Sequence, residues 1–326
     1  MGLPRLFTLC LTLCITLCLA AGCGAAPHET VVPEPPVNTE PAPPVPAETE
    51  PAAEQFRFTR ENFPRLNGST STVPLGTAVA SVLLGESREE VRDLIQFSKT
   101  TQSYRELMNG QADLLIAAEP AEVIWEEKSE AGFDWEMAPF AVDGLVFLVN
   151  VNNPVDSLTV EQLQKIYTGE ITNWSEVGGE DLPIVPFQRN AEAGSQTAMR
   201  KLVMGDLPMM DAPAEYVRGE MADLISAVAA YDGSADALGY TVYYYAEDMR
   251  MAEGLKILSV NGVAPNDGTI RSGDYPLLNN YYVLTAANLP EDNPARILYD
   301  WLLSEEGQGL VAHEGYVSVL DVEAAS

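Results

Sequence analysis

Hydrophobic and polar positions follow an alternating block pattern through residues 55–326. Stretches with helical periodicity alternate with short apolar runs that are bounded by turn residues. The apolar, strand-like runs are 113–118, 144–150, 183–188, 238–245, 255–260 and 280–285, and the helix-like stretches are 71–84, one opening at 87, 102–108, 159–168, 195–203, 220–231 and 294–311. Strands that alternate with helices predict an α/β fold. A body of about 270 residues exceeds one compact core, so we expect two lobes.

Two of the predicted helices open with a capping box. In this arrangement a hydroxyl and an acid or amide three residues later bond each other's backbone N–H groups. The pairs are Ser87 with Glu90 and Thr159 with Gln162. Gly169 stands just past the second helix, where a left-handed residue ends it.

The first residues of the chain carry a different pattern. Residues 6–19 form an apolar run, and Arg5 is the only charge before it. The run matches the apolar core of a secretory signal in length and is short for a membrane span. The run ends in small residues followed by Cys23 and resembles a bacterial lipoprotein signal. The resemblance implies that residues 1–22 are a signal peptide, with cleavage after Gly22 and lipid on Cys23. An ordinary signal peptide with a chance cysteine is the alternative.

Residues 23–54 predict a disordered tether. From residue 24 onward they hold nine prolines and six glutamates, with no lysine or arginine. Such a segment repels itself and stays extended. We expect it to hold the folded body away from a membrane, and its length favours a Gram-positive surface. A proline-rich ligand for a partner domain is the alternative.

Composition narrows the classes of function. The chain has 18 basic and 48 acidic residues and a net charge of −30, so binding to nucleic acid or to an anionic membrane through a basic face is excluded. Its four cysteines all fall within residues 1–23, and it has two histidines. We therefore expect no metal site and no cofactor.

Residues 143–179 read DGLVFLVNVNNPVDSLTVEQLQKIYTGEITNWSEVGG. This stretch resembles the phosphate-binding protein family of bacterial ABC importers, in which a strand, an NP turn, an LTxxQL helix and a TGxITNWxEVGG loop follow in this order. Residues 237–240 and the C-terminal WLLSEEGQGLVAHEGYVSV resemble later parts of that family. The resemblance covers roughly residues 62–320.

The resemblance implies a two-lobed, type II periplasmic-binding-protein fold with a central cleft and a two-strand hinge. Lobe I would be 55–141 together with 246–326, and lobe II would be 142–245. The implied function is capture of inorganic phosphate and delivery to ABC permease subunits, without catalysis. We expect an extracytoplasmic monomer that is anchored to the cell membrane through Cys23.

Three turns rich in Ser and Thr each precede a predicted helix and occupy family ligand-loop positions. Helix N-termini present unpaired N–H groups, and hydroxyls add donors that can turn toward an oxygen. The candidate phosphate-binding residues in these turns are Ser69, Thr70, Ser71, Thr100, Thr101, Ser195, Gln196 and Thr197. Each turn taken alone could simply cap its helix.

Two charged residues complete the candidate site. The family places an arginine before the third turn, and Arg189 matches it, although it lies six residues before Ser195 where the family's spacing is four. A guanidinium suits two phosphate oxygens at once. Glu119 stands where the family has an aspartate that accepts the ligand's proton and so rejects sulfate. The alternatives are a surface Arg189 paired with Glu192, and a Glu119 that assists the following helix.

Two further functions stay open at this stage. The same fold could bind another oxyanion or a phosphorylated metabolite, or could act as a sensor without transport. A cell-surface hydrolase or adhesion module is a different class of function. Against a hydrolase, residues 194–197 do not form a GxSxG nucleophile motif, and His313 is the only histidine in the body.

Overall fold

The computed structural model describes residues 56–230, 236–247 and 254–322. The predicted signal peptide, Cys23 and the tether lie outside these residues. The main sheet has eight strands, in the order β1-β2-β11-β3-β8-β5, with β12 and β9 also paired to β3. The strands of this sheet are β1 (Leu66–Gly68), β2 (Leu114–Ala118), β3 (Trp135–Asn150), β5 (Val185–Pro186), β8 (Ala237–Val242), β9 (Leu255–Ile257), β11 (Leu278–Ala286) and β12 (Val317–Ser318).

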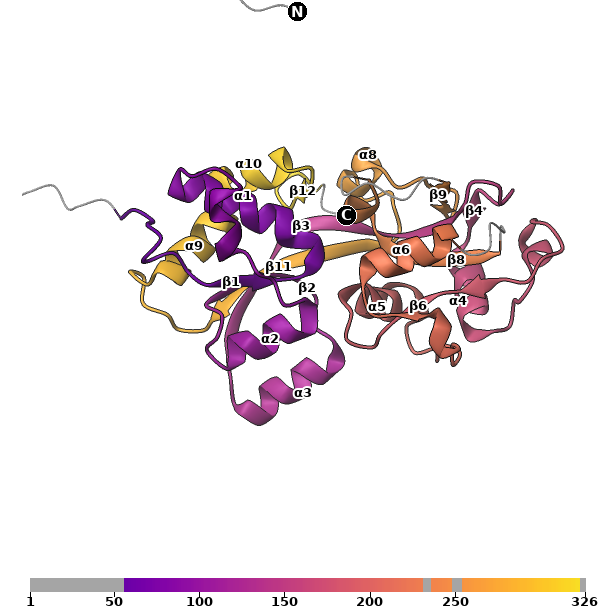
Figure 1. Cartoon of the computed structure of the whole chain (residues 1–326), viewed down its shortest axis with the longest axis horizontal. Helices are drawn as coiled ribbons and strands as arrows, with labels where there is room; N and C mark the ends of the chain where they lie inside the picture. The colour runs from indigo at the N-terminus through magenta and orange to yellow at the C-terminus, as the bar shows by residue number, and fades with distance from the viewer. Residues whose placement is uncertain (1–55, 231–235, 248–253, 323–326) are drawn as a thin grey trace, which may run out of the picture. The chain divides into compact units, whose positions relative to one another are not determined.

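Helices pack around this sheet, and two small sheets lie beside it (Figure 1). The small sheets pair β10 (Ser259–Val260) with β4 (Ser157–Leu158) and β6 (Gln188–Arg189) with β7 (Val217–Arg218). The α-helices are α1 (Val73–Leu84), α2 (Thr100–Met108), α3 (Glu122–Ala131), α4 (Val160–Thr168), α5 (Gly194–Met199), α6 (Met221–Ala230), α7 (Tyr243–Glu247), α8 (Asp267–Arg271), α9 (Pro294–Leu303) and α10 (Glu305–His313). Short 3-10 helices are η1 (Thr70–Thr72), η2 (Glu90–Leu94), η3 (Trp174–Val177) and η5 (Ala214–Tyr216), and η4 (Arg200–Met204) is a π-helix.

The 16-residue strand β3 connects the two halves of the sheet. Its residues 135–144 pair with β11, and its residues 145–149 pair with β8. One hydrophobic cluster lies at the β1–β2–β11 end and includes Leu114 and Tyr281, and another gathers around the second half of β3 with Phe147 and Tyr240. One continuous strand thus joins two separately packed halves.

Residues 255–277 pack with the second cluster. Strand β9 pairs with residues 148–150 of β3, and Ile270 and Tyr275 belong to the cluster around Phe147. The predicted lobe boundary assigned 246–326 to lobe I. The packing favours counting 255–277 with lobe II.

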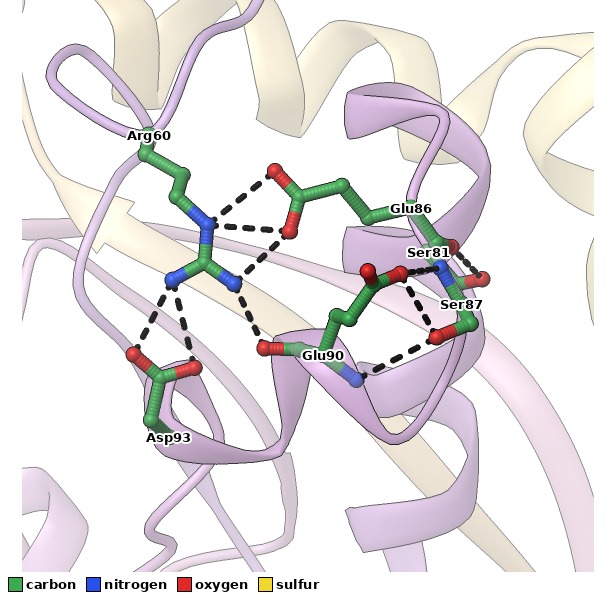
Figure 2. Close-up of polar contacts among 6 residues, drawn as sticks. All are labelled: Arg60, Ser81, Glu86, Ser87, Glu90 and Asp93. Atoms are coloured by element: carbon green, nitrogen blue, oxygen red, sulfur yellow. Dashed lines mark hydrogen bonds and ion pairs between the residues drawn. The ribbon is translucent and has the colours of Figure 1, made fainter.

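Arg60, in the segment before β1, is bonded to the turn after α1 and to η2 (Figure 2). Its guanidinium donates to the carboxylates of Glu86 and Asp93 and to the carbonyl oxygen of Glu90. These bonds, chiefly the one to Glu86, raise the pKa of Arg60 above its ordinary value. The predicted box of Ser87 and Glu90 is formed here, but the helix that it opens is the short η2.

Most predicted elements are confirmed. The predicted strand over 238–245 is wrong at its end, because β8 ends at Val242 and Tyr243–Glu247 form α7. The predicted helix over 294–311 is wrong in one respect. It is two helices, α9 and α10, that meet at Ser304. The Ser304 hydroxyl donates to Trp301 O, and its oxygen accepts from Gly307 N at 3.3 Å. Such local side-chain bonding competes with the continuous helix and starts a new one. The capping box of Thr159 and Gln162 is confirmed.

Candidate functional site

A small polar cavity of about 90 Å³ lies where three loops meet. A water molecule occupies roughly 30 Å³ in the liquid, so the cavity has room for a small anion. The first loop follows β1, the second opens α2, and the third joins β6 to α5. The predicted site residues that line the cavity are Ser69, Thr70, Ser71, Thr100, Thr101, Arg189 and Ser195.

The first and second loops are bonded to each other at the cavity wall. Ser69 Oγ lies 2.8 Å from Thr100 Oγ1 and accepts a bond from the backbone N–H of Ala118, at the end of β2. Both hydroxyl-bearing residues are buried. Strand β2 therefore holds the first loop, which in turn positions the start of α2.

The third loop closes over the second at very short range. Thr101 Oγ1 donates to the carbonyl oxygen of Glu192 at 2.6 Å. A Cβ added to Gly194 would lie 2.7 Å from Thr100 Oγ1 and 3.1 Å from the Ala118 side chain. Only glycine permits this approach without a shift of the neighbouring loop.

Arg189 is buried at the cavity wall with 7% of its surface exposed. Its side chain donates to Ser195 Oγ at 3.2 Å and to the carbonyl oxygens of Arg218 and Gly219. Burial lowers the pKa of the guanidinium below its ordinary value, although an arginine keeps its proton. No ion pair joins Arg189 to a carboxylate within the described residues. The cavity wall therefore carries a buried positive charge whose direct partners are a hydroxyl and two carbonyl oxygens, with the carboxylates of Glu220 and Asp223 acting on it without an ion pair.

The alternative reading of Arg189 as a surface residue paired with Glu192 is wrong. The carboxylate of Glu192 instead bonds Arg105, with 3.0 Å between Oε1 and Nη2. Arg105 also pairs with Glu127 at 2.8 Å. The acid within the third loop is therefore paired with a cation other than Arg189.

Three predicted ligand residues do not line the cavity. Gln196 Oε1 accepts bonds from the Arg189 backbone N–H and from the Tyr240 hydroxyl, so the Gln196 side chain stabilises the third loop. Thr197 lines a separate hollow and lies 3.5 Å from Ala193 O. Glu119 forms an ion pair with Lys201 at 2.5 Å and lines that same separate hollow.

The cavity lining also includes residues that sequence reasoning did not assign to the site, among them Lys99, Asn279 and Tyr281. The Tyr281 hydroxyl donates to the buried carboxylate of Asp143 and lies 2.9 Å from Ser71 Oγ. The sequence predicted a strand over 280–285, but nothing in its pattern indicated that this strand reaches the ligand loops. Lys99 pairs with Glu220.

A larger hollow of about 500 Å³ elsewhere is a poorer candidate for an anion. It is lined by apolar side chains such as Phe63 and Phe133 and by the acidic Glu61 and Asp113. Carboxylates repel an anion. The small cavity instead offers hydroxyls and a buried arginine, and the carboxylate in its lining, that of Glu192, is paired with Arg105. Within the described residues, no helix is both long and apolar enough to cross a membrane.

Two packed α/β halves that share long strands and enclose a polar cavity define the class of two-lobed solute-binding proteins. The chain belongs to the PBP superfamily, because the model described as "PBP superfamily domain" matches residues 47–306. The predicted α/β, two-lobed periplasmic-binding-protein fold is confirmed.

Individual relatives agree with this assignment. The phosphate-binding protein PstS of Borreliella burgdorferi is 29% identical over 188 residues, and that of Bacillus subtilis is 28% identical over 184 residues. The matches cover 55% and 56% of this chain, but only 64% and 57% of those relatives.

A solved structure supports the same family. A protein from Clostridium perfringens, described as a phosphate ABC transporter substrate-binding protein with bound phosphate, has a TM-score of 0.61 and 26% identity. It covers 78% of this chain and 98% of its own. An ABC-type phosphate transport receptor from Vibrio cholerae, at 23% identity and a TM-score of 0.57, covers 77% of this chain and 98% of its own and shares the fold.

Proposed function

We propose that this chain captures inorganic phosphate outside the cytoplasm and delivers it to the permease subunits of an ABC importer. The observation that carries the proposal is Arg189, a buried guanidinium without a carboxylate partner among the described residues, at the wall of a small cavity rich in hydroxyls. A buried charge of this kind is costly unless an opposite charge accompanies it. The phosphate-binding relatives support the same ligand.

The cavity offers a tetrahedral anion donors from several directions. Ser69, Thr70, Ser71, Thr100 and Thr101 come from the first and second loops. Arg189 and Ser195 come from the third. Hydrogen bonds to a charged acceptor are the strong ones, and a guanidinium can offer two at once. The overall charge of −30 repels anions at long range. The attraction of these nearby donors must exceed that repulsion for an anion to bind.

Ligand binding would favour closure of the two lobes. The first and second loops stand on one half of the sheet and the third loop on the other, so an anion in the cavity contacts both. A ligand shifts a conformational equilibrium toward the state in which it makes more contacts. Two ion pairs, Glu192 with Arg105 and Glu119 with Lys201, bridge the same two sides.

We propose no catalytic step. Ser195 Oγ accepts a bond from the Arg189 guanidinium, which cannot act as a base toward it. Nucleophilic activation of a serine needs the opposite arrangement, with a base that accepts the hydroxyl proton. We infer that Ser195 contributes a ligand contact.

The N-terminal residues complete the proposal. Residues 1–22 would be removed as a signal peptide, lipid on Cys23 would anchor the chain to the membrane, and residues 24–54 would act as a tether. A Gram-positive surface and a monomeric state are part of the same proposal. Substitution of Cys23 by Ala should release the protein from the membrane fraction of the host cell without changing its affinity for phosphate.

The test of the ligand site is Arg189→Ala in the full-length chain, measured by titration calorimetry with phosphate. Loss of the buried charge should weaken phosphate binding at least tenfold. The Arg189→Lys variant keeps the charge but loses the paired donors of the guanidinium, so its affinity should lie between those of wild type and Arg189→Ala. Arg200→Ala is the control, because Arg200 is an exposed arginine outside this cavity. Equal affinities of wild type and Arg189→Ala would rule out the assigned role.

A further inference from the structure

Asn279 lies at the wall of the phosphate cavity with an unused hydrogen-bond donor. Its side chain is 6% exposed, and it lines the cavity together with Arg189 and Ser195. Its Nδ2 atom is buried and has no hydrogen-bond partner within the described residues. Neither the sequence pattern nor the resemblance points to this residue.

A buried amide donor without a partner is costly. Leaving such a group unsatisfied costs about 1–3 kcal/mol, and more than nine-tenths of buried backbone polar groups and most buried side-chain ones are paired. The cost disappears when an acceptor oxygen enters the cavity. An unsatisfied donor at the wall of an anion site therefore indicates a ligand contact.

The backbone holds Asn279 firmly in this position. It is the second residue of β11, and it stands opposite Asp143 of β3 in the antiparallel register. Tyr281 lies two residues further along, so both side chains project to the same face of the strand. Since Tyr281 also lines the cavity and bonds Asp143, the two residues form one rigid wall.

We propose that Asn279 is a ligand-binding residue, whose Nδ2 donates to an oxygen of the bound anion. The inference rests on the proposed phosphate site and adds a neutral donor from the central sheet to the hydroxyls and arginine of the three loops. The anion is then held from β11 as well as from the loop ends.

The test compares Asn279→Ala and Asn279→Asp with wild type in the full-length chain, by titration with inorganic phosphate. The alanine variant should lose about tenfold in affinity, the usual value of one hydrogen bond to a charged group. The aspartate variant keeps the size but points a carboxylate at an anion, so it should lose at least a hundredfold. Asn280→Ala is the matched control, because Asn280 does not line this cavity.

A second readout separates ligand contact from a structural role. Without phosphate, Asn279→Ala removes an unsatisfied donor, so its urea midpoint should equal or exceed that of wild type. Phosphate should then stabilise wild type more than the variant. Unchanged phosphate affinity in both Asn279 variants overturns the inference alone. Absence of phosphate binding in wild type overturns the proposed function and the inference with it.

Discussion

At the scale of single residues, the proposed site depends on a few buried polar groups, among them Ser69, Thr100 and Arg189. Hydroxyl residues before a helix are visible in the sequence, and Ser69, Thr100 and Ser195 do line one cavity. Asn279 was not predictable, because its role depends on where β11 lies in the sheet. Arg189 could be proposed from its family position, but its burial could not, since that depends on the packing of β6 beside β7.

The third loop shows that a family resemblance does not fix the direction of each side chain. Arg189 lies six residues before Ser195, and the prediction placed Gln196 and Thr197 on the ligand. The structure turns Gln196 toward Tyr240 and Met209 and places Thr197 outside the cavity. Side-chain direction within a loop depends on its backbone path, which sequence alone does not fix.

A prediction at this scale concerns Gly194. Gly194→Ala should weaken phosphate binding at least tenfold, because the added Cβ would meet Thr100 Oγ1 at 2.7 Å and push the third loop away from the second. Titration calorimetry measures the loss. Gly309→Ala in α10 is the matched control, because nothing lies within 4 Å of its added Cβ. Affinities equal to wild type in both variants would mean that close approach of the two loops is not needed.

At the scale of elements, the alternation of strands and helices was predictable, but their lengths and breaks were less so. Strand β2 and helix α4 follow clear apolar runs and caps in the sequence. The apolar run at 144–150 is only the end of β3, whose first residues 135–139 are less buried and carry no continuous apolar signal. The break between α9 and α10 depends on a single serine.

A prediction at this scale concerns that serine. Ser304→Ala removes the side-chain acceptor for Gly307 N, and loss of an N-cap costs about 1 kcal/mol of unfolding free energy. Urea denaturation should show this decrease, and calorimetry should show unchanged phosphate affinity, since α10 does not line the cavity. Ser272→Ala, at an exposed serine outside any N-cap, is the control. An unchanged urea midpoint for Ser304→Ala would mean that the two helices do not depend on this cap.

At the scale of the whole molecule, a strongly acidic protein is proposed to bind an anion. The two facts agree if the cavity is shielded from the long-range field and its few donors are close and buried. Arg189 and the surrounding hydroxyls meet this condition. Among the acids near the site, Glu119, Glu192 and Glu220 are each paired with a lysine or arginine. The buried carboxylate of Asp143 instead accepts bonds from the Tyr281 hydroxyl and from backbone N–H groups. Charge composition alone would have argued against the ligand, and the resemblance argued for it.

The most direct test of the central claim is titration of phosphate into the full-length chain, after mild unfolding and refolding to remove bound anion. We expect saturable binding of one phosphate per chain in the micromolar range or tighter, with the Arg189→Ala variant at least tenfold weaker. Phosphate that gives no binding heat and no thermal stabilisation of the wild-type protein would contradict the account.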